Sequence, residues 1–163
     1  MASDSVGVLA ARVLDACRAR RWLVGIAESC TGGLVVAALT DIAGSSDVVD
    51  RGFVTYSERA KVELLGVPVS ILVTHGAVSR ETAAAMAQGV LAKSKVDLAV
   101  AVTGIAGPGG GSAEKPVGLV WFAVASRGHE PRIDRQVFAG DRAAVRAAAT
   151  RRALELLAEA AAS

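Results

Sequence analysis

The sequence predicts an α/β fold: a single three-layer α/β/α domain over residues 1–163, with a mixed, mainly parallel sheet and a C-terminal hairpin. Two observations carry this prediction. Short apolar runs alternate with helical segments through most of the chain, as in strands that are connected through helices. Near the C-terminus, the strand-like runs 117–124 and 133–138 are separated only by a short polar link, which favours an antiparallel hairpin.

The elements of the first half follow from apolar spacing and from end signals. Helical segments have apolar residues three and four apart, strands are short unbroken apolar runs, and Gly44 marks a helix stop. The predicted elements are, in order, a helix over 5–20, a strand over 22–27, a helix over about 31–40, a capped helical turn over 45–52 and a strand over 53–56.

The later elements are marked by caps and by one long apolar run. Ser57, Ser79 and Asp141 each stand before a helical segment, where a side-chain oxygen can cap the first turn. The run 97–102 is almost entirely apolar, which predicts a central strand covered on both faces. The remaining predicted segments are a short helix after Ser57 to about residue 65, a connection over 66–74, helices after Ser79 and Asp141, and a glycine-rich loop over 104–116.

Composition excludes several classes of partner. The 163 residues are 52% hydrophobic and 21% charged, which indicates a globular chain with a real core. A net charge of +2 and 4% aromatic residues make a poor nucleic-acid surface, and no apolar run approaches the roughly 18 residues of a membrane span. The N-terminus lacks the pattern of a signal peptide, and the two cysteines have no metal or redox spacing. We therefore expect a cytoplasmic protein without nucleic-acid or membrane partners.

A hydroxyl-rich turn at residues 25–33 joins a predicted strand to a predicted helix. A serine there projects from the strand end, beside free N–H groups of a helix that can stabilise a developing negative charge. Ser29 is therefore a candidate nucleophile, with Cys30, Thr31 and Gly32 as the turn that receives an oxyanion. The alternative is that Ser29 or Thr31 only caps the helix. The Cys30 thiol is interpreted as a small buried filler, with a nucleophile as the alternative.

Tyr56 and Lys61 flank the predicted cap at Ser57, in two positions whose side chains usually meet. A lysine beside the positive end of a helix, and near Arg51 and Arg59, is pushed toward its neutral form. A neutral lysine can take a proton from a serine, which is the logic of serine–lysine hydrolases. The alternative is that Tyr56 lies at the edge of the core and Lys61 is a solvated charge.

The glycine-rich loop follows a buried strand, which is where α/β sheets bind ligands. It matches neither G-x-x-x-x-G-K-[ST] nor G-x-G-x-x-G, but its glycines let backbone N–H groups approach an anion closely. The alternative is a flexible loop. The candidate substrate-binding residues are Thr103, Gly104, Gly107, Gly109, Gly110 and Arg142.

Arg142 and Arg146 lie four residues apart in the first two turns of the last predicted helix, where cations oppose the helix dipole. Either an anion binds between them and the helix N-terminus, or Asp134 or Asp141 pairs with them. No second ligand stands at metal spacing from His75, which is interpreted as structural. We expect no metal and no cofactor.

Eight segments in order resemble the CinA C-terminal domain family, and the resemblance covers about residues 5–158. They are AESCTGG (27–33), GSS (44–46), GFVTYS (52–57), AK (60–61), HGAVS (75–79), GIAGP (104–108), KPVG (115–118) and GDR (140–142). Several separate motifs in the same order make this resemblance specific.

The stand-alone members of this family are nicotinamide-nucleotide amidases of the PncC type. The resemblance thus implies hydrolysis of the carboxamide of nicotinamide mononucleotide, giving nicotinic acid mononucleotide and ammonia in pyridine nucleotide (NAD) recycling. It implies a serine amidohydrolase in which Ser29, Lys61 and Tyr56 are catalytic. We also expect a small-molecule nucleotide as substrate and a homo-oligomer. The alternatives are a non-catalytic competence- or damage-related module that binds a nucleotide or a protein, and an amidase for another nucleotide.

Overall fold

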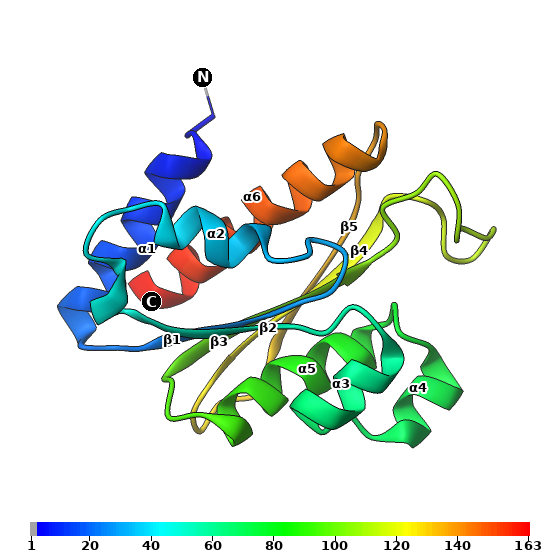
Figure 1. Ribbon diagram of the computed structural model, residues 1–163, viewed down its shortest axis with the longest axis horizontal. Helices are drawn as coiled ribbons and strands as arrows, with labels where there is room; N and C mark the ends of the chain where they lie inside the picture. Colours follow the sequence, from blue (N-terminus) through cyan, green and yellow to red (C-terminus); the bar gives the residue numbers. More distant parts are fainter. Residues whose placement is uncertain (1–2) are drawn as a thin grey trace.

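The computed structural model describes residues 3–163 as a five-stranded sheet between two layers of helices (Figure 1). Helices α1, α2 and α6 cover one face, and α3, α4 and α5 cover the other. In chain order the elements are α1 (Val6–Arg20), β1 (Val24–Glu28), α2 (Leu34–Thr40), the 3-10 turn η1 (Ser45–Asp47), β2 (Val49–Val54), α3 (Glu58–Leu65), α4 (Val69–His75), α5 (Arg80–Lys93), β3 (Leu98–Gly104), β4 (Leu119–Ser126), β5 (Arg132–Val137) and α6 (Arg142–Ala162).

The strands lie in the order β2-β1-β3-β4-β5. The β1 strand pairs in parallel with both β2 and β3, whereas β4 pairs antiparallel with β3 and β5. Four of the five strands therefore run the same way, and β4 and β5 form a hairpin. This topology confirms the predicted α/β fold with a mixed, mainly parallel sheet and a C-terminal hairpin.

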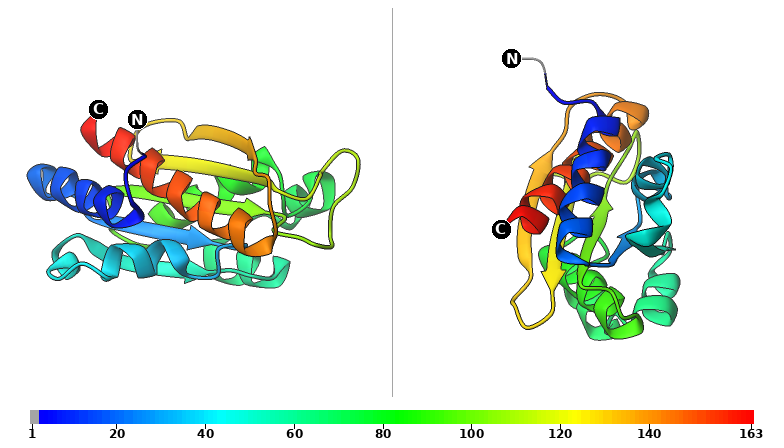
Figure 2. Two further views of the ribbon diagram at one scale, coloured as in Figure 1. Left: turned by 90° about the horizontal axis from the view of Figure 1, so that it is seen from above. Right: turned by 90° about the vertical axis from the view of Figure 1, so that its left-hand side faces the viewer.

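The central strand β3 is buried on both faces, as its apolar run predicts. Leu98, Val100 and Val102 belong to the core on the side of α1, α2 and α6. Ala99 and Ala101 belong to the core on the side of α5. Because alanines are small, α5 can lie close to that face of the sheet. On the other face, the first and last helices lie side by side (Figure 2).

The structure corrects two predicted elements on the edge side of the sheet. The predicted helical turn over 45–52 is limited to Ser45–Asp47, and the second strand begins at Val49 and ends at Val54. Residues Val49–Val54 pair with β1, so pairing across the sheet overrides the local turn signals. The helix predicted to begin near residue 31 begins at Leu34, because Gly32 and Gly33 have positive φ and continue the turn.

The segment 66–74 was predicted as a connection, but most of it is helix α4 (Val69–His75). Pro68 is the N-cap of this helix, and proline is tolerated there because that position donates no intrahelical hydrogen bond. Leu72 is buried against the α5 layer. The proline therefore starts a helix rather than breaking one.

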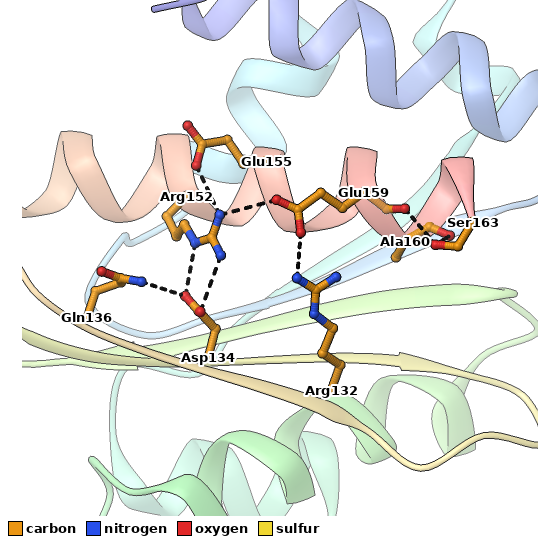
Figure 3. Close-up of polar contacts among 8 residues, drawn as sticks. All are labelled: Arg132, Asp134, Gln136, Arg152, Glu155, Glu159, Ala160 and Ser163. Atoms are coloured by element: carbon orange, nitrogen blue, oxygen red, sulfur yellow. Dashed lines mark hydrogen bonds and ion pairs between the residues drawn. The ribbon is translucent and has the colours of Figure 1, made fainter.

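Ion pairs fasten β5 to α6 (Figure 3). Arg152 donates through Nε and Nη2 to the two carboxylate oxygens of Asp134, at 2.9 and 3.2 Å. This hydrogen bond from Arg152 lowers the pKa of Asp134 below its usual value. Glu159 accepts hydrogen bonds from both Arg132 and Arg152. The network sets the hairpin against the last helix.

Within residues 3–163, no helix combines the length and the apolar composition that crossing a membrane requires.

Close packing of α3 on α5 depends on Gly89. A Cβ atom at this position would lie 2.2 Å from the Leu65 carbonyl oxygen at the end of α3. We predict that Gly89→Ala lowers the free energy of unfolding by about 1–3 kcal/mol, although alanine is the better helix former. Gly7→Ala in α1 is the control, because the atom nearest to an added Cβ there is 3.9 Å away. This substitution should raise the free energy of unfolding by up to about 1 kcal/mol. Urea denaturation measures both variants, and equal effects would contradict the close contact.

Candidate active site

The site lies where three parallel strands end together. Glu28, at the end of β1, lies opposite Val54 of β2 and Val102 of β3. The Ser29 N–H donates to the Val102 carbonyl at 3.0 Å, and the Thr55 N–H donates to the Glu28 carbonyl at 2.8 Å. The sheet register therefore places Ser29 beside the segment that leads into α3. This edge is where parallel sheets present ligand sites.

Lys61 reaches Ser29 from α3. Ser57 caps that helix by accepting the Ala60 N–H at 3.0 Å, as predicted, and Lys61 lies in its first turn and a half. Lys61 Nζ is 2.8 Å from Ser29 Oγ and 2.7 Å from the Thr55 carbonyl oxygen. The lysine is only 1% exposed, so the reading of Lys61 as a solvated charge is wrong.

Burial lowers the pKa of Lys61 to about 8, because an ammonium loses hydration when it is enclosed. The sequence predicts a lowered pKa from the positive end of the helix and from the nearby cations Arg51 and Arg59, with help from burial. Those two arginines are instead paired with Asp50 and Glu63, and desolvation is the main cause. Near neutral pH a usable fraction of this amine is unprotonated, which a base for a serine hydroxyl requires.

Tyr56 does not hold Lys61. Its side chain is 62% exposed, and its hydroxyl accepts a hydrogen bond from Arg142 Nη2 at 2.9 Å. In place of the predicted contact between Tyr56 and Lys61, Tyr56 contacts Arg142 and Lys61 contacts the Thr55 carbonyl. The Thr55 carbonyl holds the amine, a main-chain contact that residue types cannot reveal.

The start of α2 is closed by Glu28. This carboxylate is fully buried and accepts the N–H groups of Gly33, Val35 and Val36 at 3.0–3.1 Å. The helix N-terminus is thus capped by a residue that precedes it by several positions. Neither Ser29 nor Thr31 is the cap, and the first N–H groups of α2 are not free for an oxyanion. No local pattern in the sequence indicates this role of Glu28.

Two free donors remain in the turn itself. The N–H groups of Cys30 and Thr31 have no acceptor on any other residue within 3–163, whereas the Gly32 N–H donates to the Ser29 carbonyl at 3.1 Å. The Thr31 hydroxyl is buried without a partner in the same part of the chain. Burial raises the pKa of the Cys30 thiol to about 11, so at neutral pH it is neutral and a poor nucleophile.

A cavity of about 330 Å³ opens above Ser29 and Lys61. Its lining includes Tyr56, Cys30 and every residue that the sequence predicted to bind substrate, whereas Thr31 and Gly32 lie outside the lining. The Thr103 hydroxyl donates to the Ala77 carbonyl at 2.7 Å. The residues predicted to bind substrate come from distant segments of the sequence, and the fold brings them to one cavity.

The glycine-rich loop forms one wall and projects beyond the end of the sheet (Figures 1 and 2). Within residues 3–163, the N–H groups of Ala106, Gly107, Gly109 and Gly110 have no intramolecular acceptor. Arg142 Nη1 donates to the Gly107 carbonyl at 2.9 Å and so ties the loop to α6. This wall presents free donors and a cation to the cavity, which suits an anionic group.

The two arginines of α6 have different partners. Arg142 lines the cavity, whereas Arg146 donates to the carbonyls of Cys30 and Thr31. Asp141 caps α6 through the Ala144 N–H and Asp134 pairs with Arg152, so the alternative of pairing with either aspartate is wrong.

His75 lies outside the cavity lining, with Nδ1 3.5 Å from Glu81. In the part of the chain from residue 3 to 163, no three histidine, cysteine, aspartate or glutamate residues gather as metal ligands.

Comparison with known proteins identifies the family. The model of the CinA C-terminal domain matches residues 7–161. The chain belongs to the CinA C-terminal domain family. A family member from Enterobacter agglomerans, named nicotinamide-nucleotide amidohydrolase PncC, is 53% identical over 146 residues, which are 90% of this chain and 89% of that protein. The protein of the same name from Escherichia coli K12 is 50% identical over 157 residues, covering 96% and 95% of the two chains.

A solved structure from the same family has the same fold. The crystal structure of competence/damage inducible protein CihA from Agrobacterium tumefaciens matches with a TM-score of 0.94 and 49% sequence identity. The match covers 100% of this chain and 99% of that one.

Proposed function

We propose that this chain is an amidase that hydrolyses nicotinamide mononucleotide to nicotinic acid mononucleotide and ammonia, in pyridine nucleotide recycling. The observation that carries the proposal is the buried contact of 2.8 Å between Lys61 Nζ and Ser29 Oγ at the base of the cavity. Relatives of about half identity that are named nicotinamide-nucleotide amidohydrolase support the choice of substrate.

In the proposed reaction, neutral Lys61 takes the proton of Ser29 as its oxygen bonds to the carboxamide carbon. The free N–H groups of Cys30 and Thr31 receive the negative charge that develops on the carboxamide oxygen. Lys61 then returns the proton to the leaving ammonia. Water, deprotonated by the same amine, attacks the acyl-serine and releases the carboxylate product. The cationic pyridinium ring makes the carboxamide carbon more electrophilic.

The distal part of the substrate would meet the opposite wall. Arg142 and the free N–H groups of the glycine loop provide donors for the phosphate and ribose. Tyr56 and the Gly107 carbonyl hold the Arg142 guanidinium from two sides. In this proposal Tyr56 orients the substrate-binding arginine rather than the catalytic lysine. Binding energy from the phosphate then positions the carboxamide over Ser29.

A non-catalytic binding module is the competing function. Such a module needs a cavity, but it gains nothing from a desolvated amine on a serine hydroxyl, because burying that amine costs free energy. The Lys61–Ser29 contact therefore favours the amidase.

Ammonia release from nicotinamide mononucleotide tests the proposal. We predict turnover by the wild type, loss of turnover in Ser29→Ala, and a loss of at least about 10²-fold in Lys61→Ala. Because the unprotonated amine is the base, kcat/KM should rise with pH and level off above the Lys61 pKa of about 8. Free nicotinamide and the dinucleotide belong in the same panel. Binding of the mononucleotide without ammonia release would support the binding module instead.

The role of Arg142 in binding the phosphate is tested in two ways, by substituting the arginine and by using a substrate that lacks the phosphate. We predict that Arg142→Gln lowers kcat/KM for nicotinamide mononucleotide by about 10–10²-fold, since it removes a charge-assisted contact. For nicotinamide riboside, which lacks the phosphate, the same substitution should lower kcat/KM only a few-fold. Arg59→Gln is the control, because Arg59 is 85% exposed and pairs with Glu63 outside the cavity lining. An equal loss for both substrates would show that Arg142 does not contact the phosphate.

A further inference from the structure

We propose that Arg146 is a positioning residue that fixes the two peptide groups whose free N–H groups receive the oxyanion. The inference rests on the proposed function, because it assigns a part in Ser29 chemistry to a residue outside the cavity lining. It is carried by a set of hydrogen bonds between α6 and the turn that follows β1.

The contact joins segments that are far apart in sequence. Arg146 Nε donates to the Cys30 carbonyl at 3.1 Å, and Nη2 lies 3.4 Å from the Thr31 carbonyl. Arg146 is half-buried and has no carboxylate partner among the described residues. Gly32 allows the approach, since a Cβ there would lie 3.2 Å from Arg146 Nη2 and its φ is +59°.

The first carbonyl orients one free donor directly. The Cys30 carbonyl and the Thr31 N–H belong to one planar peptide group and point in opposite directions. When Arg146 draws the carbonyl toward α6, the Thr31 N–H is turned away from α6. That N–H has no acceptor on any other residue within 3–163. A guanidinium on the carbonyl also polarises the peptide group, which makes its N–H a stronger donor.

The second carbonyl orients the other donor in two steps. The Thr31 carbonyl shares a peptide group with the Gly32 N–H, which donates to the Ser29 carbonyl at 3.1 Å. The Ser29 carbonyl in turn shares a peptide group with the free Cys30 N–H. Arg146 therefore fixes three consecutive peptide groups, and two of them end in free donors.

This role explains why a cation lies near the positive end of α6, where the helix dipole disfavours it. Two carbonyl oxygens supply the compensating negative partial charge. A guanidinium can bridge both because its N–H groups form a rigid fork, whereas a lysine ammonium cannot reproduce that geometry. If Arg146 only filled the space between α6 and the turn, any side chain of similar size would serve at this position.

The test compares Arg146→Lys and Arg146→Gln with Arg151→Gln, a control on the same helix that removes a partly exposed pair with Glu155. For nicotinamide mononucleotide we expect kcat to fall by about 10–10²-fold in both Arg146 variants, with KM changed by no more than about 2-fold. In a Ser29→Ala background, the variants should bind the substrate as the parent does. A change in KM alone, or an unchanged kcat, would overturn the inference.

A second readout separates this inference from the proposed function. With p-nitrophenyl acetate, Ser29 Oγ bonds to the acetyl carbon, p-nitrophenolate leaves, and the serine proton passes to Lys61. The first-turnover rate should fall by at least about 10-fold in both Arg146 variants and stay unchanged in Arg151→Gln. If only the ester reacts and depends on Arg146, the proposed substrate is wrong and the positioning role stands. If the wild type acylates Ser29 with neither compound, both are wrong.

Discussion

The structure depends on one contact, in which a buried lysine amine meets the oxygen of Ser29 at 2.8 Å. A lysine enclosed to 1% exposure without a carboxylate on its amine is costly, and it persists only where the surroundings fix it. Here the surroundings are a strand register and a helix cap. Parallel pairing of β1 with β2 brings Ser29 beside Thr55, and the cap at Ser57 aims Lys61 back at both.

The turn that carries Ser29 is fixed from both sides. On one side, the Glu28 carboxylate takes the first N–H groups of α2, which removes them from any reaction. On the other side, Arg146 takes two carbonyls and leaves the N–H groups of Cys30 and Thr31 free. The carboxylate of Glu28 thus binds N–H donors at one end of the turn, and the guanidinium of Arg146 binds carbonyl acceptors within it. What remains in this turn is the Ser29 hydroxyl and two N–H groups, those of Cys30 and Thr31, that have no acceptor on another residue within 3–163.

Sequence patterns that span only a few residues predict helix caps and strands well. The caps at Ser57, Ser79 and Asp141 and the central apolar strand are confirmed, because each depends on neighbours within a turn or a few residues. Helix α4 was missed because Pro68 signals a break as readily as a start. The contacts of Glu28, Thr55 and Arg146 depend on main-chain atoms and on sheet register, which no residue pattern encodes. Lys61 was selected for its position beside the cap at Ser57, and its pKa is lowered mainly by burial rather than by the neighbouring arginines.

The most direct test is a titration of the Lys61 amine itself by NMR. The chain has only four lysines, Lys61, Lys93, Lys95 and Lys115, so each labelled side chain can be followed, and Lys61→Met assigns the signal. We predict a pKa of about 8 for Lys61, below its ordinary value of 10.5, because burial disfavours the ammonium. A midpoint near 10.5 for Lys61 in the folded protein would contradict a role for this amine as the base of Ser29.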